Sequence, residues 1–217
     1  MKIDLHVHTE YSEDSLLKLE HIAKVVAEKK VDAVAITDHN EVEGAIKLKK
    51  ASAFPVIVGE EIESQQGDII GLFLQERIEP GLTAGETITR IKNQGGLVLI
   101  PHPFDRLRSS ATGEKPLKKL VEKIDIIEVL NARNIFPADN QLAFNFALKH
   151  NLLQAAGSDA HTKNEVGNAY VETNSFTCAE DFLIQLHDAK IGGGRSSLLY
   201  HAASKAAKFF SSLHKMG

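Results

Sequence analysis

The stretch IDLHVHT, residues 3–9, follows Met1 and Lys2 and alternates in the manner of a β-strand. Because side chains two residues apart lie on the same side of a strand, this pattern predicts one apolar and one polar face. The apolar face would hold Ile3, Leu5 and Val7, and the polar face Asp4, His6 and His8. Such a polar face is either the solvent-exposed face of an edge strand or one wall of a metal site. The second alternative is open because imidazoles at i and i+2 share a face and can bind one ion.

The composition narrows the class of protein. A chain of 217 residues is long enough for one medium domain with a full core, or for two small ones. The net charge of −4 argues against nucleic acid or an anionic membrane surface as the partner. The single cysteine, Cys178, excludes an internal disulfide framework and a zinc site built from several cysteines. No apolar run is long enough to span a bilayer and no signal-like segment is found, so we expect a cytoplasmic protein.

Short apolar runs alternate with amphipathic helical stretches along the chain. The predicted strands are residues 3–7, 33–37, 56–62, 68–74, 97–101, 125–131 and 153–159, and the predicted helices are residues 19–27, 41–50, 83–95, 140–150 and 177–186. Turn residues at 65–67 predict a hairpin over residues 56–74. Two helices begin with capping-box patterns, Thr83 with Glu86 and Thr177 with Glu180.

This alternation predicts an α/β fold of parallel strands joined by right-handed crossovers. So many strand–helix units in one chain of 217 residues favour a small barrel with fewer than the usual eight strands. A dinucleotide-binding fold has no support, because no Gly-x-Gly-x-x-Gly follows the first strand. We therefore expect a single barrel domain.

Polar residues gather where the predicted strands end. Chemistry in such barrels takes place at the carboxyl ends of the strands, and half of the ten histidines fall there. These five are His6, His8, His39, His102 and His161, whereas His21, His150, His187, His201 and His214 fall in helical segments or the tail and are expected at the surface. The accompanying polar residues are Asp38, Glu60, Glu61, Glu63, Glu128, Asn131 and Asp159. One such histidine is usually a loop residue, but imidazoles and carboxylates converging on one barrel mouth need cations, which favours a cluster of divalent metals.

Five segments, in order, carry a resemblance to a known family. They are DLHVHTEYS (4–12), AITDHN (35–40), VGEEIE (58–63), PHP (101–103) and GSDAH (157–161). From about residue 3 to residue 195 the chain resembles the PHP (polymerase and histidinol phosphatase) family. The resemblance implies a distorted (β/α)7 TIM-like barrel, which we assign to residues 1–197; the spacing of apolar residues beyond it predicts a C-terminal amphipathic helix over residues 198–217. It also implies two or three divalent metal ions, Zn, Mn, Fe or Mg, and phosphoester hydrolysis.

The resemblance also implies a set of ligands. His6, His8 and Asp159 would hold one metal and His102 a second, with Glu61 bridging the two. Glu61 is preferred to Glu60 because the family places this acid two residues after a glycine, here Gly59.

The remaining ligands are less regular. His39 and His161 would serve a third metal together with Asp14, with Glu13 as the weaker alternative. Asp68 stands where the family commonly has a histidine at the second metal. A carboxylate there would favour manganese, iron or magnesium over zinc, and if Asp68 faced solvent instead, that metal would be weakly held.

Phosphoester hydrolysis assigns further roles. The nucleophile would be a metal-bridging hydroxide, and the leaving oxygen would be protonated by a metal-bound water, by His39 or by His161. Arg133 and Arg195 are the arginines expected to bind phosphate, although either could be a solvated surface residue. The same role is less favoured for Arg106 and Arg108. Asp38 and Asp4 would orient ligand imidazoles, and for Asp4 plain structural hydrogen bonding is an equal alternative.

The predicted function is that of a metal-dependent phosphoric ester hydrolase, a phosphomonoesterase or phosphodiesterase, acting on a small phosphorylated metabolite or nucleotide. One alternative is a non-catalytic RNA-binding barrel resembling the RNase P protein subunit, which the negative net charge and the nearly complete ligand set disfavour. Another is cleavage of a non-phosphate bond, for which a bridging lysine at a strand end would be expected; Glu61 occupies that place.

The tail carries a helical apolar stripe. It consists of Leu199, Ala202, Ala203, Ala206, Phe209, Phe210 and Leu213. We expect this helix to pack on the barrel, with a homodimer contact or a membrane-surface helix as the alternatives.

Overall fold

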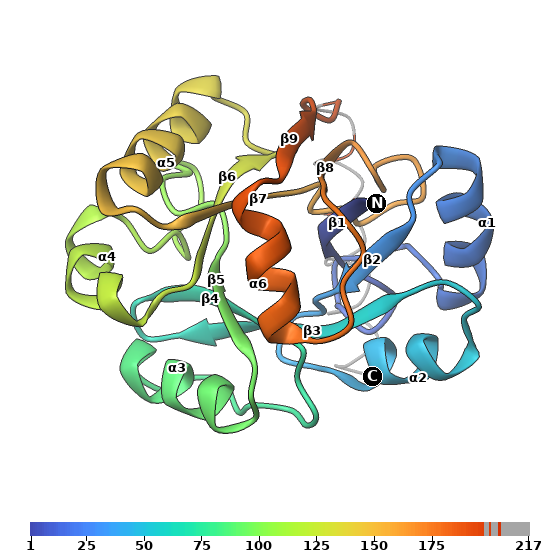
Figure 1. Cartoon of the computed structure of the whole chain (residues 1–217), viewed down its shortest axis with the longest axis horizontal. Helices are drawn as coiled ribbons and strands as arrows, with labels where there is room; N and C mark the ends of the chain where they lie inside the picture. The colour runs from blue at the N-terminus through green and yellow to red at the C-terminus, as the bar shows by residue number, and fades with distance from the viewer. Residues whose placement is uncertain (198–199, 201–203, 205–217) are drawn as a thin grey trace, which may run out of the picture.

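The computed structural model describes residues 1–197, Tyr200 and Ser204 (Figure 1). In this part of the chain the strands form one sheet with the spatial order β7-β6-β5-β4-β3-β2-β1-β8-β9. The strands are β1 (Lys2–Val7), β2 (Ala33–Ile36), β3 (Val56–Ser64), β4 (Gly67–Leu72), β5 (Leu97–Ile100), β6 (Ile126–Asn131), β7 (Leu153–Gly157), β8 (Ala169–Glu172) and β9 (Lys190–Gly193).

The sheet contains two parallel runs, β1–β2–β3 and β5–β6–β7. Strand β4 joins them and lies antiparallel to both β3 and β5, which confirms the hairpin predicted over residues 56–74. Strands β8 and β9, which the periodicity did not predict, are also antiparallel to their neighbours. The parallel strands expected from the alternation are thus present in two runs, to which the structure adds the antiparallel β8 and β9, and the six strands of the two runs direct their carboxyl ends to the same edge.

The two ends of the parallel region meet. Just beyond β7, Ala160 pairs with Val7, and the Ala160 carbonyl accepts a hydrogen bond from the His8 amide at 2.9 Å. The approach is so close that a Cβ on Gly157 would lie 2.3 Å from the Cβ of His6. The sheet is thus a nearly closed barrel, as expected, while the count of seven strand–helix units stays a prediction.

Helices surround the barrel (Figure 1). They are α1 (Leu19–Lys29), α2 (Glu43–Ala51), α3 (Ala84–Asn93), α4 (Glu114–Leu120), α5 (Pro137–His150) and α6 (Ala179–His187), with a short 3-10 helix at Val121–Lys123. Helices α1 to α5 pack on the outer face of the sheet, where Ile22, Ile88 and Phe146 join one apolar cluster. Helix α6 packs instead on a second apolar cluster, on the inner face of the sheet, which we call the inner cluster. It includes Leu5, Ile126 and the fully buried Phe182 of α6.

Strand β1 departs from strict alternation. Its register with β2 shifts between Asp4 and Val7, so Leu5 lies in the inner cluster while Val7 lies in the outer one. The prediction that Asp4, His6 and His8 share one face is confirmed for His6 and His8, whose Nε2 atoms lie 3.0 Å apart, and is wrong for Asp4. A bulge of this kind turns His6 toward the mouth of the barrel and leaves Asp4 to bond elsewhere.

Two helix predictions need correction, and one helix of the structure matches none of the predicted ones. Helix α5 begins at Pro137, earlier than the expected Asn140, because proline suits the first helical position. The cap of α6 is not a Thr177–Glu180 box; instead the Asp181 carboxylate accepts hydrogen bonds from the amide and hydroxyl of Thr177. Helix α4 had not been predicted. The tail helix expected over residues 198–217 lies outside the described residues apart from Tyr200 and Ser204.

The capping box of α3 is present as predicted. Thr83 accepts from the Glu86 amide at 3.3 Å, and Glu86 accepts from the Thr83 amide at 3.0 Å. We expect Thr83→Ala to lower the free energy of unfolding by about 1 kcal/mol, because it removes the hydroxyl that accepts from the Glu86 amide and donates to the Glu86 carboxylate. Urea unfolding measures this, with Thr89→Ala, an exposed threonine within the same helix, as the control. Equal effects of the two substitutions would contradict the capping role.

Candidate metal centre

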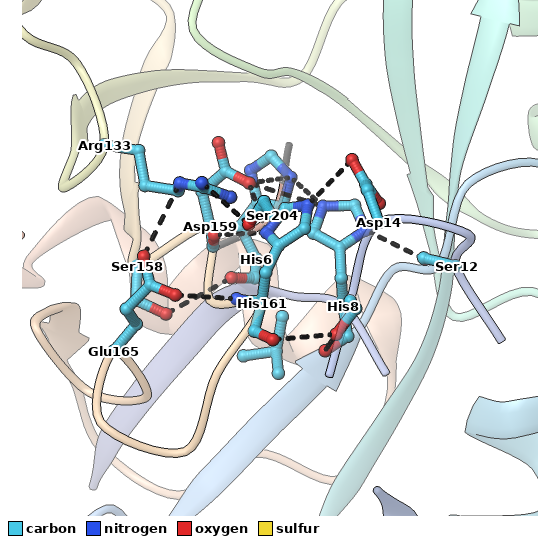
Figure 2. A network of polar contacts seen from close by, with 12 residues as sticks. His6, His8, Ser12, Asp14, Arg133, Ser158, Asp159, His161, Glu165 and Ser204 are labelled. Carbon is cyan, nitrogen blue, oxygen red and sulfur yellow. Dashed lines mark hydrogen bonds and ion pairs between the residues drawn. The ribbon is translucent and has the colours of Figure 1, made fainter. Parts of the chain in front are cut away.

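The polar side chains at the strand ends converge at one mouth of the barrel (Figure 2). Four groups of side chains have ligand atoms that lie within 4.8 Å of one another. They are His6–His8–Glu61, His6–His102–Asp159, Glu61–Asp68–His102 and His8–His39–His161. The structure therefore brings together eight of the nine predicted ligands in these groups, and the ninth, Asp14, lies beside His39 and His161.

His6 and His8 face each other with their Nε2 atoms 3.0 Å apart. The Nδ1 atom of His6 lies 3.0 Å from Glu128 Oε1, a carboxylate oxygen that can only accept a hydrogen bond, so the ring is the donor. The Nδ1 atom of His8 lies 3.2 Å from Ser12 Oγ, whose own hydrogen goes to Asp38 Oδ1 at 2.7 Å. Both imidazoles thus carry their proton on Nδ1 and turn an Nε2 lone pair inward. Two lone pairs at this distance repel unless a cation, either a proton or a metal ion, lies with them.

Glu61 stands at the centre of the cluster. Its Oε1 lies 2.9 Å from His102 Nε2, and its Oε2 lies 3.2 Å from His8 Nε2 and 3.4 Å from His6 Nε2. Glu61 is almost fully buried, and its Oε2 has no hydrogen-bond partner among the described residues. A buried carboxylate oxygen without a donor, surrounded by imidazole nitrogens, is a suitable ligand for a divalent cation.

The neighbouring Glu60 points away from the centre. Its carboxylate accepts from the Ile78 amide at 2.8 Å, and burial raises the pKa of this carboxyl to about 8. This supports the choice of Glu61 over Glu60 as the inward-facing acid.

Asp159 contributes one free oxygen. Its Oδ2 accepts hydrogen bonds from Arg108 and, at 3.2 Å, from Asn131 Nδ2. Its Oδ1 lies 3.4 Å from His8 Nε2 and is buried without a hydrogen-bond partner in the described part of the chain. Asp159 and His102 both have positive φ, 54° and 30°, a backbone strain that is common at functional sites.

The third group of candidates lies toward the surface. Asp14 Oδ2 is 3.3 Å from His161 Nε2 and 3.6 Å from His39 Nε2. His161 is held by its Nδ1, which donates to the Asp159 carbonyl at 2.8 Å. His39 is 35% exposed and His161 only 3%, so His39 is the more accessible of the two.

Asp68 is buried rather than solvent-facing. Its ligand atom lies within 4.8 Å of those of Glu61 and His102. Burial, and to a smaller extent the negative charge of Glu61, raises the pKa of Asp68. The alternative that Asp68 faces solvent is therefore wrong. Its role as a metal ligand stays a prediction.

The charges of the cluster attract a cation. Burial alone would lower the pKa of the His6 imidazole, but Asp159, Glu128 and Glu61 raise it well above its ordinary value. Burial alone would raise the pKa of Glu61, but His6, His39 and His102 hold it well below its ordinary value. Burial, with His8 beside it, lowers the pKa of His161 to about 4, so this ring is neutral and able to donate a lone pair.

The four arginines have different surroundings. Arg133 is buried, pairs with Glu165 at 3.5 Å and donates to Ser204 Oγ at 3.0 Å (Figure 2). Arg195 is exposed and donates to the Ile135 carbonyl. Arg106 pairs with Asp139. Arg108, for which a role at the site was the less favoured prediction, reaches Asp159. Arg133 and Arg108 are thus near the centre, while no contact places Arg195 or Arg106 there among the described residues.

Several supporting residues were missed or undervalued from the sequence. Glu128 and Ser12 fix the two imidazoles, and Asn131 and Arg108 bind Asp159. Asp38 acts through Ser12, as an orienting residue would. The position of Glu128 and Asn131 at a strand end was the available signal. No periodic pattern marks Ser12 or Arg108, because both lie in loops.

A cavity of about 790 Å³ adjoins the centre. Its lining includes Tyr11, Asp14, His39, Asp68 and Ser110. This volume lies within the range of small-molecule sites in enzymes. No helix in the described part of the chain has both the length and the apolar character needed to cross a membrane.

Comparison with known proteins gives consistent results. The family model described as PHP domain matches residues 4–123, and the model described as PHP-associated matches residues 137–191. The uncharacterized protein MJ1587 of Methanocaldococcus jannaschii is 40% identical over 162 residues, which cover 69% of this chain and 92% of that protein. The uncharacterized protein MJ0417 of the same organism is 37% identical over 175 residues, covering 79% and 70%.

Solved structures share the fold. A two-domain protein from Bacteroides vulgatus containing a predicted PHP-like metal-dependent phosphoesterase matches with a TM-score of 0.71 and 16% identity; the match covers 89% of this chain and 65% of that one. An amidohydrolase from Chromobacterium violaceum, solved with bound sulfate and no metal, matches with a TM-score of 0.63 and 18% identity, covering 77% and 90%. At these identities the likeness establishes the fold.

Proposed function

Because the chain belongs to the PHP domain family, we propose that it is a metal-dependent phosphoric ester hydrolase acting on a small phosphorylated metabolite or nucleotide. The observation that carries the proposal is the inward pair of Nε2 atoms of His6 and His8, 3.0 Å apart beside Glu61 Oε2, which has no hydrogen-bond partner in the described part of the chain. This donor set of imidazoles and carboxylates fits Zn, Mn or Fe, and with Asp68 also Mg.

We assign the ligands in three sets. His6, His8 and Asp159 would hold one ion. His102 and Asp68 would hold a second, and Glu61 would be shared by these two ions. His39, His161 and Asp14 would hold a third. When bound, such ions would supply a nucleophile at neutral pH and offset the charge of the phosphate.

The protein's own groups do the rest. Glu128 and Ser12 hold the His6 and His8 rings so that no rotation is needed when an ion binds. The leaving oxygen needs a proton. When the third set holds no ion, His39 would be free to supply it, and it is better placed than His161 to take a proton from solvent because its side chain is 35% exposed. The adjoining cavity is large enough to accept the remainder of a small substrate.

Arg133 is proposed to bind phosphate, which would displace the Ser204 hydroxyl from its guanidinium. Arg195 keeps this role only as a prediction from the sequence.

The test is turnover by the metal-loaded protein. A panel of phosphomonoesters and phosphodiesters is offered to protein loaded with Mn²⁺, Zn²⁺ or Fe²⁺, then to protein stripped with a chelator, then to reloaded protein. We expect turnover of at least one ester class that disappears on stripping and returns on reloading. Metal-loaded protein that hydrolyses no ester in the panel but binds structured RNA would favour the non-catalytic alternative.

A further inference from the structure

We propose that Arg108 is a positioning residue that leaves Asp159 with a single oxygen available to the metal centre. The proposal rests on the metal centre proposed above, and it concerns how one ligand of that centre is oriented. It assigns to an arginine in the loop after β5 a role toward the metal rather than toward the substrate.

The Asp159 carboxylate is asymmetric in its contacts. Oδ2 receives two donors, the Arg108 guanidinium and the Asn131 side-chain amide at 3.2 Å. Oδ1 receives none from the described residues and lies among imidazoles, 3.4 Å from His8 Nε2 and 3.8 Å from His6 Nε2. With Oδ2 occupied by charge-assisted hydrogen bonds, only Oδ1 remains as a ligand. Asp159 would therefore bind a metal through one oxygen rather than two.

Arg108 is itself held in place before it reaches Asp159. Its Nε donates to Asp105 Oδ2 at 3.1 Å. Asp105 is buried, its other oxygen accepts from the Leu107 amide at 2.9 Å, and its own amide donates to the His102 carbonyl at 3.1 Å. The loop that begins at the candidate ligand His102 thus aims the guanidinium at Asp159. A loosely held surface arginine would have no such support.

The chemistry of arginine suits this position. Its planar guanidinium can bond two carboxylates at once and stays charged at every physiological pH, so it cannot release Oδ2 by losing a proton. The Arg108 side chain is 23% exposed, which limits competition from water. Removal of groups that orient a metal ligand typically weakens metal binding by about 10- to 100-fold.

The chain offers a matched control in the same loop. Arg106 also pairs with an aspartate, Asp139, but its side chain is 52% exposed and bonds none of the candidate ligands among the described residues. Arg106→Met therefore removes an arginine–aspartate pair of similar chemistry from the same segment.

The experiment measures metal binding without substrate. Stripped wild-type, Arg108→Met and Arg106→Met proteins are titrated with Mn²⁺ by calorimetry and with Co²⁺ by visible absorption, which reports coordination number. We expect Arg108→Met to weaken the tightest binding about 10- to 100-fold and to change the Co²⁺ spectrum, and Arg106→Met to do neither. Asp105→Asn, which loosens the hold on the Arg108 Nε without removing any group that touches Asp159, should shift both readouts in the same direction by less. It serves as the test if Arg108→Met fails to fold by circular dichroism.

The outcomes separate this proposal from the proposed function. Metal affinity and Co²⁺ spectrum unchanged in Arg108→Met, with only KM for a phosphoester raised, would overturn it and make Arg108 a substrate contact. A shift of equal size in Arg106→Met would overturn it as well. If wild-type protein binds metal and shows the predicted shifts but hydrolyses no phosphoester, the proposed function fails and the role of Arg108 stands.

Discussion

Replacing Glu61 with alanine is expected to lower kcat/KM for the best phosphoester at least about 1,000-fold and to reduce the number of bound metal ions. The reason is its place in the site. Its two oxygens lie between 2.9 and 3.4 Å from ring nitrogens of four histidines, His6, His8, His39 and His102. Loss of this one carboxylate removes a ligand from two of the four candidate groups and takes away the negative charge that lies among the four imidazoles.

Steady-state turnover and metal content of the same preparation measure the effect. His8→Ala and Asp159→Ala should reduce turnover in the same way, because each removes an inward ligand atom. Glu172→Gln, an exposed carboxylate at the end of β8, serves as the control and should leave both readouts unchanged. Turnover that survives in Glu61→Ala, His8→Ala and Asp159→Ala alike would show that the chemistry takes place elsewhere.

The second large effect concerns stability. Asp4→Asn is expected to lower the free energy of unfolding by about 3 kcal/mol, although the two side chains have nearly the same shape. Oδ1 of Asp4 accepts from the amides of Ser158 and His6, and Oδ2 accepts from the Gly167 amide at 2.7 Å and from the Ser158 hydroxyl. Whichever way the new amide is turned, its NH₂ group meets hydrogen-bond donors in a fully buried site.

Urea unfolding at pH 8 tests this, because burial raises the pKa of Asp4 only to about 6 and the carboxylate is then ionised. The control is Asp32→Asn. Asp32 is exposed and one of its oxygens accepts from the Lys2 amide at 2.7 Å, a donor that an amide oxygen can equally satisfy. We expect a loss below about 1 kcal/mol for this control. A loss for Asp4→Asn no larger than the control's would contradict the view that Asp4 ties the end of β7 to β1.

The location of the centre could be predicted because it follows from chain direction alone. Parallel strands bring their carboxyl ends to one edge, so five histidines at four strand ends had to meet if the strands shared a sheet. The structure bears this out for His6, His39 and His102, which come from three different strand ends. The hairpin and the Thr83 capping box were likewise readable, because each depends on residues close together in sequence.

The orientation of single side chains could not be predicted in the same way. The bulge in β1 depends on pairing with β2 and places Asp4 against Ser158 instead of beside His6. Arg106 and Arg108 look alike in sequence, yet only Arg108 reaches the centre, because the buried Asp105 turns it there. Such choices depend on loop geometry and on contacts between distant segments, neither of which leaves a periodic signal.

The central claim is that this mouth of the barrel binds several divalent metal ions. It is tested most directly by elemental analysis of the purified protein after equilibration with Mn²⁺, Zn²⁺ or Fe²⁺ and removal of unbound ions. The account predicts two or three tightly held ions per chain in the wild-type protein and fewer in Glu61→Ala. Wild-type protein that retains none of these metals after loading would contradict it.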